Sequence, residues 1–125
     1  MLDKYLMLKE TYPKSIIMIK SGSFYECLNE DAIVMNNIFN YKIKKFSKYI
    51  RVGYPINRLN YVTSILTKKC INYVIIDNSI INKEKFNYNK YNEYTSINIY
   101  DINIKLNTIY NYLYNNRLVR KLKIW

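Results

Sequence analysis

The chain has 125 residues, no histidine and a formal net charge of +11, from 20 Lys+Arg against 9 Asp+Glu. This length suits a single domain with its own hydrophobic core, and the lack of histidine excludes imidazole catalysis and histidine metal ligands. The positive charge favours polyanionic partners, although AT-rich codons would also enrich a chain in Lys, Asn, Ile and Tyr.

The sequence carries neither a signal-peptide pattern nor a run of about 18 uncharged apolar residues, so we expect a cytoplasmic protein without a membrane span. Its two cysteines, Cys27 and Cys70, lie among apolar residues and lack metal-ligand spacing. We expect both to be reduced core residues, with a disulfide between them as the alternative. Neither a metal nor another cofactor is expected.

The first forty residues alternate between helical and extended patterns. Apolar residues recur at helical spacing over residues 2–10, and that helix should stop before Pro13. Short apolar runs predict strands over residues 16–20 and 24–28. A second helix is expected over residues 29–40, with asparagine at both ends and acidic residues in its first turn.

The middle of the chain predicts an antiparallel hairpin of residues 41–46 and 49–52 around a turn at residues 47–48. Its cations include Lys42, Lys44, Lys48 and Arg51. They would form either a basic surface for a ligand or simply the solvated face of the hairpin. We expect Gly53-Tyr54-Pro55 to end the second strand.

The second half of the chain begins with a predicted helix over residues 57–69 and a buried, central strand over residues 71–76. A polar loop is expected at residues 82–93, a further strand at 95–100, and a basic amphipathic helix from Asp101 onward. Helices that alternate with strands in this way indicate an α/β fold.

The most informative stretch is Ser21-Gly22-Ser23-Phe24-Tyr25-Glu26. If the last three residues are extended, Phe24 and Glu26 share one face of the strand, about 7 Å apart, and Tyr25 points to the other face. Gly22 removes side-chain bulk just upstream, so a ligand or another backbone could approach closely. An apolar wedge beside a hydrogen-bonding acid is a candidate recognition motif.

Four blocks of sequence lie in one register: Tyr5-Leu6-Met7-Leu8-Lys9-Glu10-Thr11-Tyr12-Pro13, Gly22-Ser23-Phe24-Tyr25-Glu26, Glu30-Asp31-Ala32 and Gly53-Tyr54-Pro55. Over residues 2–78 they resemble the N-terminal mismatch-recognition domain, domain I, of the MutS DNA repair family. The resemblance implies an α/β fold with a mixed sheet of about five to six strands and about three to four flanking helices. Residues 79–125 would be a C-terminal extension of the same domain.

The resemblance also implies roles for side chains. The family's Phe-x-Glu motif corresponds to Phe24 and Glu26: its phenylalanine wedges into the minor groove and stacks on a mispaired or unpaired base, which its glutamate hydrogen-bonds. Unstacking costs least where pairing is already poor, so a wedge can sense a lesion. A glutamate that bonds an acceptor nitrogen of a base must be protonated. The candidate DNA-binding residues are Ser21, Gly22, Ser23, Phe24, Glu26, Lys48, Arg51 and Arg58.

The chain departs from the family pattern in several places. Ser21 and Ser23 replace the outer residues of Met-Gly-Asp, and Ile56 and Asn57 stand where the family has Tyr-His, so the finer DNA contacts should differ. The sequence stops where MutS would continue into connector, lever, clamp and ATPase domains, and it contains no Gly-x-x-x-x-Gly-Lys-Ser/Thr phosphate loop.

We therefore expect a stand-alone, non-enzymatic protein that binds mismatched or distorted DNA, with RNA or an RNA–DNA hybrid as alternative ligands. The second hypothesis is an adaptor for a reverse transcriptase or other polymerase of a mobile or diversity-generating element, docked through residues 101–125. We do not expect an enzyme, because Glu26, Glu30, Asp31 and Asp77 do not form a compact two-metal cluster. Glu30 and Asp31 instead suit the start of a helix.

Overall fold

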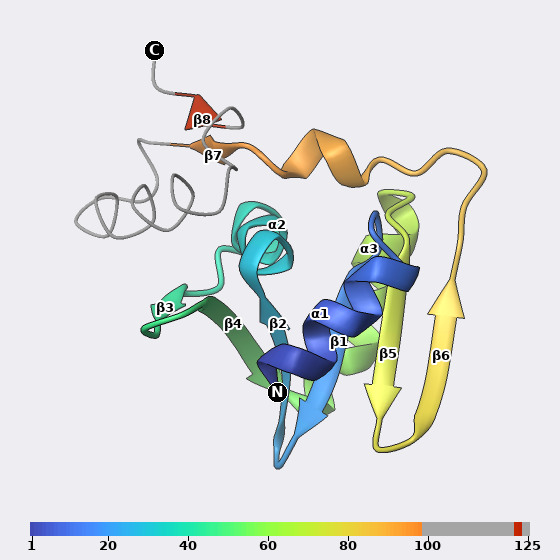
Figure 1. Cartoon of the computed structure of the whole chain (residues 1–125). Helices are drawn as coiled ribbons and strands as arrows, with labels where there is room; N and C mark the ends of the chain where they lie inside the picture. The colour runs from blue at the N-terminus through green and yellow to red at the C-terminus, as the bar shows by residue number, and fades with distance from the viewer. Residues whose placement is uncertain (99–121, 124–125) are drawn as a thin grey trace.

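The computed structural model describes residues 1–98 and 122–123 and is built around a six-stranded sheet in the order β3-β4-β2-β1-β5-β6 (Figure 1). The strands are β1 (Ile16–Ser21), β2 (Phe24–Leu28), β3 (Lys44–Lys45), β4 (Ile50–Pro55), β5 (Tyr73–Asp77) and β6 (Ile80–Glu84). The helices are α1 (Leu2–Thr11), α2 (Asn29–Phe39) and α3 (Leu59–Lys68), with short 3-10 turns η1 (Ile56–Arg58) and η2 (Tyr91–Tyr94). Two further short strands, β7 (Ile97–Asn98) and β8 (Leu122–Lys123), pair in parallel.

The sheet is mixed. Strand β1 pairs antiparallel with β2 and parallel with β5, while β4 pairs antiparallel with β2 and β6 antiparallel with β5. Strand β1 lies between β2 and β5 and is buried from Ile16 to Ile19. This arrangement confirms the predicted α/β fold with a mixed sheet and flanking helices. None of the helices in the described residues has the length and apolar character needed to span a bilayer.

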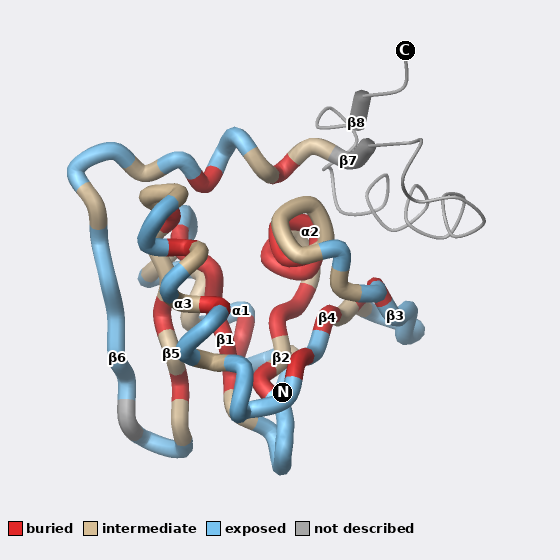
Figure 2. The backbone as a smooth tube through the Cα atoms, turned by 180° about the vertical axis from the view of Figure 1, so that it is seen from behind, coloured by how far each residue is buried: buried red, intermediate tan, exposed pale blue. Residues whose placement is uncertain are grey.

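The two faces of the sheet carry separate hydrophobic clusters. On one face, residues of α2 and α3 such as Val34 and Leu66 pack against Met18 and Val52. On the other face, α1 covers the centre of the sheet and lies in front of β1 in Figure 1. Figure 2 shows that both edge strands, β6 and β3, are exposed. Because α1 covers the centre, the β2–β4–β3 end of its face is left open.

A buried carboxylate joins four elements at the centre of the domain. Asp31 accepts hydrogen bonds from the Tyr5 hydroxyl at 2.8 Å, the Lys9 ammonium at 3.0 Å and the Ile17 backbone N–H at 3.0 Å. The Tyr91 hydroxyl of η2 also donates to it. Asp31 lies in the first turn of α2, as predicted. Tyr91 is fully buried, so residues beyond 78 contribute to the core; the division of the chain at residue 78 stays a prediction.

Two expectations for strands are wrong. Gly53-Tyr54-Pro55 does not end a strand, because β4 continues to Pro55 and pairs residue for residue with β2. Pro55 is the last strand residue, a position where a missing backbone N–H does little harm. Part of the expected loop is β6, which is paired along its length with β5. Its described side chains are exposed, so backbone pairing rather than an apolar pattern defines this strand.

Other expectations are met in part. Asn40 ends α2 in the left-handed conformation, as predicted, whereas Asn29 is the first residue of the helix and its side chain makes no capping hydrogen bond. In the hairpin the first strand is only β3, and the Phe46 N–H donates to the Tyr49 carbonyl to close the turn. Both cysteines are free thiols; Cys27 is buried and Cys70 half-buried. Most of the helix expected from Asp101 onward lies outside the described residues, and Leu122–Lys123 in this tail form β8 instead.

Candidate nucleic-acid interface

The candidate motif is placed at the tip of the β1–β2 hairpin. Ser21 and Phe24 are paired partners, so the turn consists of Gly22 and Ser23. Gly22 has φ +60, while Ser23 is not among the residues with positive φ. This pattern suits a type II′ turn, whose first central position favours glycine and whose twist matches that of the flanking strands. The turn makes Phe24 the first residue of β2.

Strand alternation then divides the three motif residues between the faces of the sheet. Tyr25 is 4% exposed, and its ring stacks on Tyr54 within the α2–α3 core, with 5.8 Å between the centroids. Phe24 is 48% exposed on the opposite face, which it shares with Glu26. Glu26 pairs with Ile19, which packs beneath α1. Phe24 is therefore an exposed aromatic side chain at the open end of the α1 face, not a core residue.

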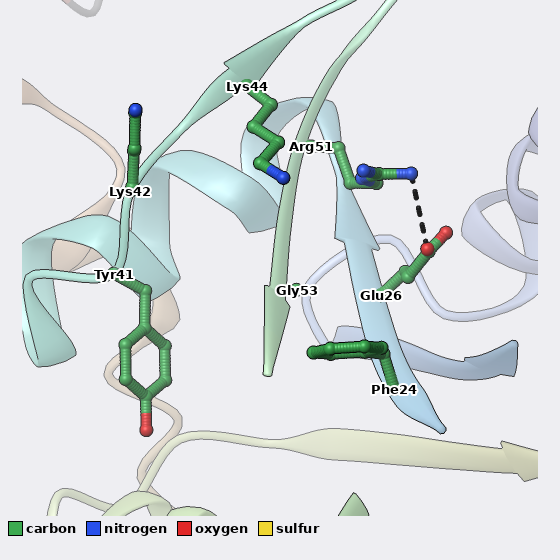
Figure 3. Close-up of a pocket in the computed structure, with 7 residues that line it drawn as sticks. All are labelled: Phe24, Glu26, Tyr41, Lys42, Lys44, Arg51 and Gly53. Carbon is green, nitrogen blue, oxygen red and sulfur yellow. Dashed lines mark hydrogen bonds and ion pairs between the residues drawn. The ribbon is translucent and has the colours of Figure 1, made fainter. Parts of the chain in front are cut away.

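A groove of about 210 Å³ crosses this open end (Figure 3). It is lined by Phe24, Glu26, Tyr41, Lys42, Lys44, Arg51 and Gly53. Gly53 is the paired partner of Glu26 and contributes no side chain. A Cβ at this position would lie 3.7 Å from the Tyr25 carbonyl oxygen and 4.0 Å from Glu26 Cγ, both ordinary contacts. Gly53 thus leaves room in the groove that a side chain at this position would occupy.

Arg51 is held by two partners on this face. Its Nη1 lies 3.2 Å from Glu26 Oε2, and its guanidinium lies over the Phe46 ring, with Cζ 4.5 Å from the centroid. Phe46 in turn stacks on Tyr49, with 4.9 Å between the ring centroids. A guanidinium over an aromatic face gains a favourable electrostatic contact. In the unbound structure Arg51 is therefore a positioned cation, not a freely moving one.

The two lysines of the groove, unlike Arg51, have no acidic partner within the described residues. Lys42 and Lys44 are exposed, and the salt bridges found within the described residues involve Lys9, Lys20 and Arg51 instead. With no acid to neutralise them within the described residues, these two lysines keep their positive charge available on the rim of the groove. Such charges attract phosphates without reading sequence.

The structure brings only some of the predicted residues together. Phe24, Glu26 and Arg51 line one groove, and the turn residues Ser21, Gly22 and Ser23 are exposed beside Phe24. Lys48 and Arg58 do not line the groove: Lys48 lies in the turn between β3 and β4, and Arg58 lies over the Tyr61 ring, 4.6 Å from its centroid.

Sequence reasoning missed Tyr41 and Gly53 altogether as site residues, and it named Lys42 and Lys44 only as part of a possible basic surface, not as candidate DNA-binding residues. The Tyr41 ring stacks on Phe39, with 5.2 Å between the centroids, and lies across β4 from Phe24 in Figure 3. Gly53 would have been found from the pairing of β2 with β4, which sets a glycine directly opposite Glu26. No three potential His, Cys, Asp or Glu ligands gather as a metal site within the described residues.

The fold and the site together define a class: an α/β sheet domain that presents an aromatic and an acidic side chain in a basic groove on the open part of one face. Residues 1–102 match the family model described as MutS domain I. The chain therefore belongs to the MutS domain I family, which is the mismatch-recognition domain of MutS proteins.

Individual relatives support the same assignment. The DNA mismatch repair protein MutS of Thermotoga maritima is 32% identical over 60 residues, which cover 48% of this chain and 8% of the relative. The MutS protein of Prochlorococcus marinus is 31% identical over 91 residues, covering 66% of this chain and 10% of the relative. That of Fervidobacterium nodosum is 31% identical over 67 residues, covering 53% and 8%. The chain thus matches a small part of each of these much longer proteins.

Proposed function

We propose that this domain binds mismatched or otherwise distorted DNA, with Phe24 as a wedge that stacks on a poorly paired base. The observation that carries the proposal is that Phe24 is 48% exposed at the tip of the β1–β2 hairpin. An exposed phenylalanine has no role in the core, and here it lies at the edge of a basic groove. Membership of the MutS domain I family points to the same role.

The discrimination follows from the cost of inserting a ring between bases. Unstacking a step costs roughly a few kcal/mol, and least where the base is mismatched. Stacking a base on an aromatic side chain returns roughly 1–3 kcal/mol. In fully paired DNA the two terms roughly cancel, whereas at a mismatch the stacking term prevails. Phe24 would thereby favour lesions without reading their sequence.

The remaining candidates would hold the phosphate backbone. Lys42 and Lys44 line the same groove as Phe24, and we expect them to contact phosphates beside an inserted ring. Lys48 and Arg58 would extend this contact on either side. The turn residues Ser21, Gly22 and Ser23 offer hydroxyl and backbone N–H donors next to the wedge. With a net charge of +11, the domain should bind DNA with a steep dependence on salt.

The test is a titration of fluorescently labelled duplexes, one fully paired and one with a single mismatch, followed by anisotropy over a series of salt concentrations. We expect tighter binding to the mismatched duplex, and Phe24→Ala should remove that preference. Tyr88→Ala is the matched control, because Tyr88 is an 81% exposed aromatic residue. Its neighbour Asn89 donates a hydrogen bond to the Lys14 carbonyl, just before β1 and at the opposite end of that strand from the hairpin. Equal affinity of the wild-type domain for both duplexes would refute mismatch recognition, and RNA or hybrid duplexes in the same assay would show whether those ligands bind better.

Other parts of the functional hypothesis have no further support. The adaptor role depends on residues 101–125, of which the structure describes only residues 122–123, so docking to a polymerase or reverse transcriptase stays a prediction. The same holds for action without the other MutS domains and for the absence of enzymatic activity.

A further inference from the structure

The acid of the motif is turned away from the wedge. Figure 3 shows the Glu26 carboxylate directed toward Arg51 and away from the Phe24 ring, although both side chains leave the same face of β2. The geometry has a simple origin: Glu26 pairs with Gly53, and Arg51 is two residues along β4. With no side chain on Gly53, the carboxylate and the guanidinium meet diagonally across the strands.

This ion pair is partly shielded from water. The side chain of Glu26 is 14% exposed and that of Arg51 is 25% exposed, and Phe46 covers one face of the guanidinium. Shielding strengthens the attraction relative to a pair on an open surface. While the pair is closed, its charges cancel locally, so it neither attracts nor repels a phosphate strongly.

We propose that Glu26 and Arg51 exchange partners when Phe24 engages a poorly paired base. Glu26 rotates toward the base and leaves Arg51, and the guanidinium then binds an adjacent phosphate. Arg51 is thus a specificity-determining residue, because its phosphate contact forms only on DNA that lets Glu26 reach a base. This inference rests on the proposed wedge function of Phe24.

Both parts of the exchange, the movement of Glu26 to a base and of Arg51 to a phosphate, have a physical reason. If Glu26 stayed between Phe24 and the DNA backbone, its charge would repel phosphates. When Glu26 hydrogen-bonds a base, the base replaces Arg51 as its partner. A guanidinium released from a carboxylate is geometrically suited to a phosphate, which it can bind through two N–H groups. In fully paired DNA the insertion of the wedge brings no net gain, so such DNA mostly meets the closed, neutral pair.

Lys42 and Lys44 provide the contrast within the same groove. They have no acidic partner within the described residues, so nothing restricts their phosphate contacts to one kind of DNA. They should contribute equally to the binding of paired and mismatched duplexes. The proposed exchange therefore assigns different behaviour to cations that line one groove.

The experiment compares salt slopes. In a plot of log affinity against log salt concentration, each neutralised phosphate adds about −0.9 to the slope for duplex DNA. The wild-type slope for a mismatched duplex should be steeper by about 0.9 than that for the paired duplex. In Glu26→Gln, the paired duplex should show the same steep slope as the mismatched duplex, because Arg51 is free to bind a phosphate in both complexes. In Arg51→Gln, both duplexes should show the shallower slope that the wild type has for paired DNA. Lys44→Gln, the matched control, should make both slopes shallower by the same amount.

The wild-type measurement can refute the exchange even if Arg51→Gln fails to fold, and Arg51→Lys, which keeps the charge, should retain the slope difference. Equal slopes together with a clear preference for mismatched DNA would refute the exchange and leave the wedge function intact. No preference for mismatched DNA would refute the wedge function itself. A slope difference that persists in Arg51→Gln would assign the extra contact to another residue and overturn the proposal.

Discussion

Gly53→Val should stabilise the fold and weaken DNA binding at the same time. A glycine inside a strand costs roughly 0.5–1 kcal/mol relative to alanine, and valine suits a strand better than either. The new Cβ would make only ordinary contacts, 3.7 Å from the Tyr25 carbonyl oxygen and 4.0 Å from Glu26 Cγ. We therefore expect the free energy of unfolding to rise by about 0.5–1 kcal/mol.

The methyl groups of the valine would also fill part of the groove beside Phe24. A base could then no longer stack there, and a loss of roughly 1–3 kcal/mol of stacking lowers the affinity for mismatched DNA by roughly 5- to 150-fold. Urea unfolding and anisotropy titrations measure the two effects on one sample. Asn82→Val on the exposed edge strand β6 is the control, and it should leave DNA binding unchanged. Unchanged mismatch affinity in stable Gly53→Val would refute the assignment of the groove.

Two further predictions concern the core. Asp31→Asn should lower the free energy of unfolding by about 3–5 kcal/mol, since it leaves the Lys9 ammonium without its buried partner; Asp77→Asn, whose ion pair with Lys20 is a third exposed, should cost about 0–1 kcal/mol. Burial, and for Tyr91 also the charge of Asp31, raises the pKa values of Tyr54 and Tyr91 above the usual 10.0. These groups hold their protons more tightly when folded, so their contribution to stability is complete below pH 10 and falls above it. Unfolding titrations at alkaline pH measure this decline, which Tyr91→Phe should make shallower; an equally steep decline in that variant would contradict the assignment.

Local pattern was enough to predict much of the fold. The apolar runs of β1 and β5, the helical spacing of α2 and α3, and the alternation that separates Phe24 and Glu26 from Tyr25 all depend on neighbouring residues in the sequence. The family resemblance was equally local, since it rests on short blocks in register. The two glycines of the chain show the limit: the turn at Gly22 can be anticipated from its neighbours, whereas the groove at Gly53 cannot.

What the sequence did not predict depends on contacts between distant segments. Arg51 looked like one of several hairpin cations, but the register of β4 against β2 places it against Glu26. Asp31 looked like a helix-start residue, and only the packing of α1 and η2 onto α2 shows it to be a buried acceptor. Strand β6 is held by backbone pairing with β5. Its exposed side chains need no apolar pattern, so the sequence carries no signal for this strand.

The central claim, that Phe24 stacks on a poorly paired base, can be tested by placing a fluorophore at that position. Trp125 is the only tryptophan of the chain, so the double variant Phe24→Trp, Trp125→Phe carries a single indole at the tip of the hairpin. Stacking on a base should quench its emission. At equal fractions of bound protein, we predict clear quenching with a mismatched duplex and little with a fully paired one. Equal emission in the two complexes would contradict the account.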